Sequence, residues 1–197
     1  MVTLHAWCVQ TNERYISRVF SHADPSFCFC RVGAQARSSG IPADVLQWTM
    51  VPIIPIVLPV PGLVELRADA RAEGFNFLDT LVNDWASGVN CFDAPGEVLC
   101  GHFDQGMLVA VGGLNIDPFA GDPEIGRIRR VYVRSAWRNR GVGRALVMHL
   151  VEYARRNFKW VRLRAENDGA ARLYERLGFV PTESPEATHI FIARSEQ

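Results

Sequence analysis

The amino-acid sequence predicts an α/β domain with a mixed sheet, in which antiparallel strands precede a parallel strand–helix–strand unit. The 197 residues are 48% apolar and 21% charged, a composition that suits a globular chain able to bury a core. From Met50 onward, β-rich runs alternate with helical stretches. A long amphipathic stretch, Gly141–Phe158, lies between two β-rich runs, which is the pattern of a right-handed parallel crossover.

The first half of this pattern predicts an edge strand, two helices and a hairpin. Met50–Val57 is β-rich but contains prolines, which confine a strand to the edge of a sheet. Helices are expected over 61–74 and 76–88, where apolar residues recur at helical spacing and a glycine ends each stretch. Glu97–Phe103 and Met107–Asn115 are β-rich runs joined by an Asp-Gln-Gly turn, and we expect them to form an antiparallel hairpin.

The second half predicts the crossover and two closing strands. Arg127–Arg134 is a strand whose imperfect alternation indicates a β-bulge. The long helix follows, and Trp160–Ala165 is the next strand. Asp168–Leu177 is a last helix that ends at a glycine, and Phe179–Val180 and His189–Ala193 are β-rich.

Residues 1–49 show no sustained period and precede the first interpretable element. We expect them to be a disordered or non-native N-terminal extension, with 50–197 forming the domain. Two alternatives remain. Apolar residues such as Trp7 and Trp48 could dock on the domain or on a partner, or the segment could be an organellar targeting sequence.

Composition excludes several classes of protein. The 21 basic and 21 acidic residues cancel, which argues against nucleic-acid or membrane binding through bulk charge. The most apolar stretch, Val51–Leu63, is short for a bilayer span and is interrupted by prolines, so no membrane anchor is expected. Five irregularly spaced cysteines favour a reducing, cytoplasmic setting. Cys28 and Cys30 match no standard zinc spacing, and no metal is predicted.

Charge is strongly segregated along the chain. Residues 62–126 contain 2 basic and 11 acidic residues, whereas residues 127–176 contain 14 basic and 4 acidic residues. Two interpretations are open on charge alone. The two blocks could be solvated faces, or they could form one site for a polyanion and another for a cation.

A glycine- and arginine-rich turn lies between the predicted strand at 127–134 and the long helix. Its residues are Arg138, Asn139, Arg140, Gly141, Val142, Gly143, Arg144 and Ala145. The first turn of a helix exposes backbone N–H groups and a positive dipole end, so this segment is a candidate pyrophosphate site. A flexible helix start with solvated arginines is the alternative. A dinucleotide fingerprint would need a third glycine, and a Walker loop would need a Gly-Lys-Ser/Thr sequence.

A second motif lies downstream of the next strand, where Asn167 is followed by Ala171, Tyr174, Gly178 and Phe179. The two motifs together resemble the GNAT superfamily of acetyl-CoA-dependent N-acetyltransferases, and the resemblance covers about Met50–Arg194. It implies a GNAT-like acyl-CoA N-acyltransferase fold, with antiparallel N-terminal strands and a parallel β-α-β core that binds the cofactor.

The resemblance also implies roles for individual residues. The backbone of Val131, Tyr132 and Val133 would pair with the pantetheine arm of acetyl-CoA like an added strand, and Arg138–Ala145 would hold the pyrophosphate. Asn167 would contact the pantetheine or adenine side. Tyr174 would point its hydroxyl toward the sulfur. The basic block 127–176 coincides with this half, which favours a cofactor-binding side over a merely solvated face.

The chemistry requires a proton donor and a proton acceptor. Tyr174 is the predicted general acid for the thiolate leaving group, although an aromatic side chain here could simply pack against Leu177 and Phe179. Family members often have a carboxylate on the strand before the pyrophosphate site, but this chain has arginines at 129 and 130. Glu124 is therefore the candidate base, with Asp117 as the alternative carboxylate.

The predicted function is transfer of an acetyl group from acetyl-CoA to a primary amine of a small molecule or peptide, by direct attack in a ternary complex. The alternative is a non-catalytic acyl-CoA sensor or interaction module on the same fold. A cationic acceptor is expected, because the acidic block 62–126 lies in the half that walls the acceptor side in the family. No nucleic-acid or membrane partner is expected, and a homodimer is left open.

Overall fold

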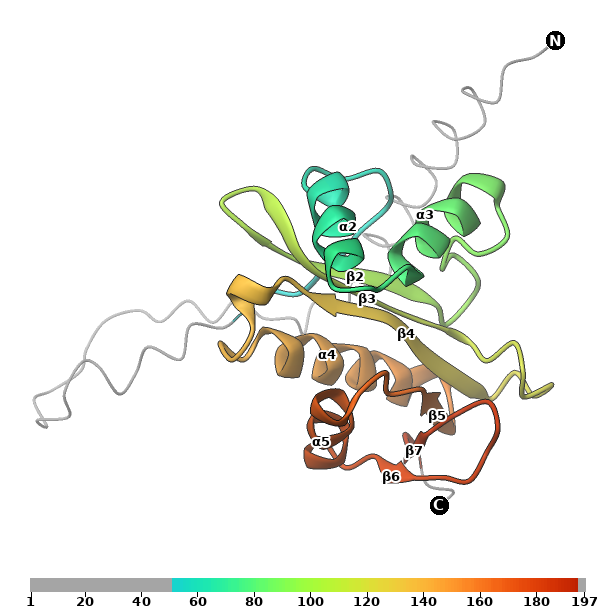
Figure 1. Cartoon of the computed structure of the whole chain (residues 1–197). Coiled ribbons are helices and arrows are strands. Elements are labelled where there is room, and N and C mark those ends of the chain that lie inside the picture. Colours follow the sequence, from blue (N-terminus) through green and yellow to red (C-terminus); the bar gives the residue numbers. More distant parts are fainter. Residues whose placement is uncertain (1–50, 195–197) are drawn as a thin grey trace, which may run out of the picture. The chain divides into compact units, whose positions relative to one another are not determined.

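A seven-stranded mixed sheet forms the centre of the computed structural model, which describes residues 51–194 (Figure 1). The strand order is β1-β2-β3-β4-β5-β7-β6. The strands are β1 (Ile54–Pro55), β2 (Val98–Asp104), β3 (Met107–Ile116), β4 (Ile125–Val133), β5 (Trp160–Leu163), β6 (Val180–Pro181) and β7 (His189–Ile192). The predicted α/β class with its mixed sheet is confirmed. Residues 1–49, for which a disordered or non-native extension was expected, lie outside the described residues, as do Cys28 and Cys30.

Helices cover both faces of the sheet. They are α2 (Leu63–Ala72), α3 (Phe77–Ser87), α4 (Val142–Asn157) and α5 (Asp168–Arg176), with a short 3₁₀ turn, η2 (Ser135–Trp137), before α4. Helices α2 and α3 lie on one face, and α4 and α5 lie on the other (Figure 1). Within residues 51–194, every helix is too short or too polar to cross a membrane.

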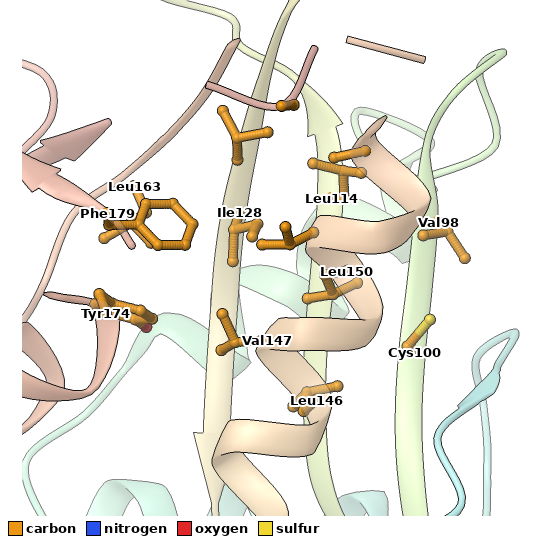
Figure 2. Packing of buried hydrophobic residues seen from close by; sticks show 14 of the residues in the cluster. Val98, Cys100, Leu114, Ile128, Leu146, Val147, Leu150, Leu163, Tyr174 and Phe179 are labelled. Atoms are coloured by element: carbon orange, nitrogen blue, oxygen red, sulfur yellow. The ribbon is translucent and has the colours of Figure 1, made fainter. Parts of the chain in front are cut away.

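Each face has its own apolar core. On the α4 side, Leu146 and Leu150 pack against Leu114 and Ile128 of the sheet (Figure 2). On the other side, buried leucines of α2 and α3 pack against β2, β3 and Tyr132 of β4. Strand β3 is sandwiched between these cores and is buried from Leu108 to Asn115, so it is the central element of the domain.

The N-terminal strands are antiparallel, as predicted. β1 pairs with the edge of β2 over only two residues, shorter than the run Met50–Val57, because its prolines lack the N–H that a ladder requires. The β2–β3 hairpin turns at Gln105 and Gly106, whose φ angles of 48° and 80° are both left-handed. Consecutive left-handed residues match the right-handed twist of hairpin strands.

Strand β4 contains the predicted bulge. Val111 pairs with Tyr132 and Gly113 pairs with Arg129, so two residues of β4, Arg130 and Val131, lie opposite the single residue between those partners. Arg130 has a φ of 60°, the irregular backbone that the extra residue produces. The bulge bends β4 next to the point where the sheet opens.

The sheet opens between β4 and β5. These strands pair in parallel only over Ile125–Arg127 and Trp160–Arg162, as the crossover through α4 predicts. Beyond Arg127, β4 continues to Val133 while pairing only with β3, so its other edge carries no strand within the described part of the chain. The divergence exposes backbone polar groups along one side of Ile128–Val133.

Candidate functional site

A cleft of about 850 Å³ occupies the place where β4 and β5 separate. Its walls come from β4, the loop and helix start at 138–144, the segment from Arg164 through α5, and the loop between α2 and α3. The cleft thus brings together segments that are up to about a hundred residues apart in sequence. It joins the two sequence motifs and adds a third wall that the motifs do not contain.

The start of α4 has free backbone N–H groups, and we call residues 138–145 around it the cradle. Asn139 and Gly141 are left-handed, with φ angles of 60° and 82°, and they turn the chain into the helix. The first helical hydrogen bond runs from the Ala145 N–H to the Gly141 carbonyl at 2.9 Å, so the N–H groups of the three residues between them have no helical partner. No side chain caps them. An anion would satisfy these groups.

Five of the eight predicted cradle residues line the cleft: Arg138, Asn139, Gly141, Gly143 and Arg144. Arg140, Val142 and Ala145 are not on its wall. The Val142 side chain is buried in the α4-side core, so only its backbone could take part. A Cβ at Gly143 would lie 3.6 Å from Val133 and from Leu173, which both line the cleft.

Arg138 is held in place by two elements. Its Nε donates to the Val133 carbonyl at 2.9 Å, and its Nη2 donates to Glu73 at 2.6 Å. The Tyr132 hydroxyl also donates to Glu73, at 3.0 Å, and burial followed by this hydrogen bond raises the pKa of Tyr132 to about 12. Glu73 therefore ties the end of α2 to the cradle. No local sequence signal indicated Glu73, because its partners lie 59 and 65 residues away.

Tyr174 lies on the cleft wall and is also packed. Its ring makes edge contact with Phe179 at 5.8 Å between centroids and lies 6.3 Å from His189 (Figure 2). The side chain is 6% exposed, and among residues 51–194 its hydroxyl makes no hydrogen bond. Burial, and then the nearby charge of Glu166, raise the pKa of Tyr174 to about 12. The hydroxyl is therefore protonated at neutral pH, and the ring packs against Phe179 as the packing alternative predicts.

Asn167 and the β4 edge complete the predicted cofactor residues. Asn167 caps α5 by accepting a hydrogen bond from the Ala170 N–H at 3.0 Å, and it lines the cleft. Val131, Tyr132 and Val133 line the opposite wall. Glu166, which precedes Asn167, also lines the cleft, and its place beside the motif is the signal that could have identified it.

Neither candidate base lies in the cleft. Glu124 is in the loop before β4, where it forms a 2.8 Å ion pair with Lys159, and it does not line the cleft. Asp117 is fully buried between Arg127 and Arg162, at 3.4 and 3.3 Å. These geometries fit structural ion pairs. The carboxylates on the cleft wall are Glu73, Glu166 and Glu186.

The acidic and basic blocks of the sequence pair with each other. Asp69 binds Arg134 at 2.5 Å, and Asp84 binds Arg130 at 3.2 Å. The ion pairs of Glu73, Asp117 and Glu124 described above also join the two blocks. Three carboxylates of the acidic block, Asp69, Glu73 and Asp84, therefore hold the α2–α3 segment against β4 and the residues that follow it, and Glu73 is the carboxylate of this block that lines the cleft.

The comparisons with known proteins agree with this geometry. A model of the acetyltransferase (GNAT) family matches residues 61–179. The chain therefore belongs to this family, and the resemblance of its two motifs is confirmed. The matched span runs from the start of α2 to the end of the second motif.

Two curated relatives match short parts of the chain. An uncharacterized N-acetyltransferase of Methanocaldococcus jannaschii is 37% identical over 65 residues, which are 30% of this chain and 28% of the relative. The N-alpha-acetyltransferase RimI of Mycobacterium tuberculosis is 32% identical over 68 residues, which are 31% of this chain and 43% of RimI. The chain thus matches less than half the length of either relative.

Solved structures share the fold. A putative acetyltransferase from Exiguobacterium has a TM-score of 0.65 at 24% identity, covering 72% of this chain and 92% of that one. The ribosomal-protein-S18-alanine N-acetyltransferase of Escherichia coli has a TM-score of 0.53 at 17% identity, covering 74% and 97%. The predicted GNAT-like fold is therefore confirmed.

Proposed function

We propose that the protein is an N-acetyltransferase that moves an acetyl group from acetyl-CoA to a primary amine by direct attack in a ternary complex. One observation carries the proposal: the unpaired edge of β4 and the uncapped start of α4 face the same cleft. Acetyl-CoA has an extended arm with amide groups and a pyrophosphate. A strand edge can pair with the amides, and free N–H groups can bind the pyrophosphate. Family membership and the N-acetyltransferase relatives support this proposal.

The residues present fit acetyl-CoA. The edge at Val131–Val133 offers backbone groups to the pantetheine amides, as an added strand would use them, apart from the Val133 carbonyl, which accepts from Arg138. The free N–H groups at the start of α4, with Arg144 beside them, suit the pyrophosphate. Asn167 lies on the opposite wall within the same cleft. When bound, acetyl-CoA supplies an acyl group activated as a thioester.

The protein's own residues must manage two protons. An alkylamine with a pKa near 10.4 is protonated at pH 7, and removing its proton costs roughly 4–5 kcal/mol. We propose that Tyr174 donates a proton to the departing sulfur, because its hydroxyl is protonated and makes no competing hydrogen bond within residues 51–194. The bulge at Arg130 and Val131 leaves backbone N–H groups outside the regular ladder, where they can stabilise negative charge on the acetyl oxygen.

The test measures thiol release from acetyl-CoA with a panel of amines, amino acids and peptides, together with acetyl-CoA binding by calorimetry. Tyr174→Phe should lower amine-dependent thiol release by about 10²- to 10⁴-fold and leave acetyl-CoA affinity within about twofold. Tyr153→Phe is the matched control, because Tyr153 is a half-buried tyrosine of α4 that does not line the cleft. An unchanged rate in Tyr174→Phe would assign Tyr174 to packing alone.

A non-catalytic acyl-CoA-binding module is the second candidate. It is favoured by one observation: the middle of β4 has arginines at 129 and 130, and neither Glu124 nor Asp117 lies in the cleft. Binding does not separate this candidate from an enzyme. Saturable acetyl-CoA binding without amine-dependent thiol release across the panel would establish the module and refute the transferase.

A further inference from the structure

Arg129 lies on the α2–α3 side of the sheet, the side that the resemblance to the family assigns to the acceptor. Ile128 packs into the α4-side core, and neighbouring residues of a strand point to opposite faces, so Arg129 points toward the α2–α3 side. The bulge puts Arg130 on that side as well, where it reaches Asp84 of α3. Arg129 is half-buried and lines the cleft together with Phe75.

The other arginines of this region are neutralised by partners on neighbouring elements. Arg127, Arg130, Arg134 and Arg138 each form an ion pair with an aspartate or glutamate. Arg129 differs, because within residues 51–194 its guanidinium group makes no ion pair and no hydrogen bond. A half-buried guanidinium has lost much of its hydration, and leaving it without an acceptor is unfavourable.

The surroundings of Arg129 make an added anion favourable. Burial, followed by repulsion from Arg130 and Arg127, lowers the pKa of Arg129, and the weaker attraction of Asp84 and Asp117 does not offset these effects. The group stays charged at neutral pH, since an arginine pKa begins far above that range. A ligand anion would relieve both the desolvation and the repulsion.

The phosphates of acetyl-CoA are not the natural partners of this group. Arg129 precedes Val133 by four residues, which is about 13 Å of extended strand, and the cradle begins only beyond Val133. The cleft also has aromatic walls, since Phe75 and Phe77 lie against Tyr132 of β4 and Phe119 lies against Arg127. A carboxylate suits the planar guanidinium because the two groups can form paired hydrogen bonds.

We propose that Arg129 binds a carboxylate of the acceptor, so that the acceptor is an amine that also carries a carboxylate, such as a free amino acid. This inference rests on the proposed function and narrows its substrate class. The amine remains a cation in solution, but the acceptor as a whole is zwitterionic or anionic. The preference for one acceptor over another would then come from Arg129 rather than from the acidic block 62–126. Three carboxylates of that block, Asp69, Glu73 and Asp84, already pair with arginines of the basic block.

The experiment uses the full chain and compares the twenty standard amino acids with their primary amides, which differ only in the carboxylate. Thiol release gives kcat/KM for each pair, and calorimetry gives the affinity of each pair for the protein saturated with CoA. We expect the acids to be preferred by about 10- to 100-fold, the size of a charge-assisted hydrogen bond. Arg129→Gln should remove the preference while changing the KM for acetyl-CoA less than about twofold.

Two further variants sharpen the comparison. Arg129→Lys keeps the charge but not the fork, and it should restore part of the preference. Arg156→Gln removes an exposed arginine of α4 that does not line the cleft, and it should behave like the wild type. If Arg129→Gln fails to fold, the preference for acids over amides is compared between the wild type and Arg129→Lys. An equal preference in both would overturn the carboxylate site, and a smaller one in Arg129→Lys would support it.

The outcomes separate this inference from the proposed function. Acids that bind the CoA complex in an Arg129-dependent way, without turnover, would support the carboxylate site and refute the transferase. Turnover with no preference for acids, or a preference that survives in Arg129→Gln, would overturn the carboxylate site and leave the transferase intact. Failure of every acid to bind would also overturn it.

Discussion

Replacing Asp117 with asparagine should destabilise the domain strongly. The Asp117 side chain has 0% exposure and pairs with Arg127 and Arg162, whose side chains are 8% and 13% exposed. Asparagine keeps the shape and can still accept the 2.9 Å hydrogen bond from the Phe119 N–H, but it removes the only carboxylate that pairs with both buried guanidinium groups within residues 51–194. Breaking a buried pair from one side costs about 3–5 kcal/mol.

This cost can be measured by urea and thermal unfolding. For a domain of this size, each kcal/mol lowers Tm by about 2–4 °C, so the expected decrease is about 6–20 °C. Asp93→Asn is the matched control, because Asp93 is exposed and makes no ion pair within residues 51–194, and its Tm should stay within about 2 °C of the wild type. A wild-type Tm in Asp117→Asn, combined with a loss of turnover, would refute the assignment of Asp117 to a structural ion pair and favour it, the alternative carboxylate, as the base.

Three further predictions concern stability. Gly113→Ala should cost at least about 1–3 kcal/mol in urea unfolding, because its Cβ would lie 2.2 Å from the buried ring of Phe92; an unchanged midpoint would contradict this packing. Burial raises the pKa of Tyr174 to about 12 against an ordinary value near 10, so the native state binds more protons between these values and stability should fall as pH rises from 10 to 12. Tyr174→Phe should reduce that fall by about 2–3 kcal/mol, and an identical pH profile would refute the shift. We also propose that deleting residues 1–49 costs less than about 2 kcal/mol, because residues 51–194 by themselves supply an apolar core on each face of the sheet, and a larger loss of stability would place that segment in the fold.

The features that the sequence predicted well have local signals. The β-bulge was visible because the strand at 127–134 breaks its alternation, and the structure has two residues of β4 opposite one of β3. The hairpin turn and the crossover through α4 were likewise specified by contiguous residues. The two family motifs could be identified because each occupies a short run, and the fold then brings them to one cleft.

The features that the sequence did not predict depend on distant pairings. Glu73 reaches the cleft because α2 packs on the sheet over β3, which brings its end to Tyr132 and Arg138, and nothing near position 73 indicates those contacts. Summed charge does not show which residues of the acidic block pair, and the ion pairs of Asp69 and Asp84 appear only in three dimensions. The cationic acceptor stays a prediction. The position of Arg129 follows from the same pairing, since among residues 51–194 it is the arginine of β4 that forms no ion pair.

We propose that the cleft holds acetyl-CoA with its pyrophosphate at the start of α4. Calorimetric titration of acetyl-CoA into the wild type and into Gly143→Val tests it most directly. A Cβ at Gly143 would meet only ordinary contacts of 3.6 Å with Leu173 and Val133, so we expect folding and Tm to be retained while the valine methyl groups obstruct the approach of the pyrophosphate. We predict saturable binding by the wild type below millimolar acetyl-CoA and at least about tenfold weaker binding by the variant. Equal affinities, or no heat from the wild type at millimolar acetyl-CoA, would contradict the claim.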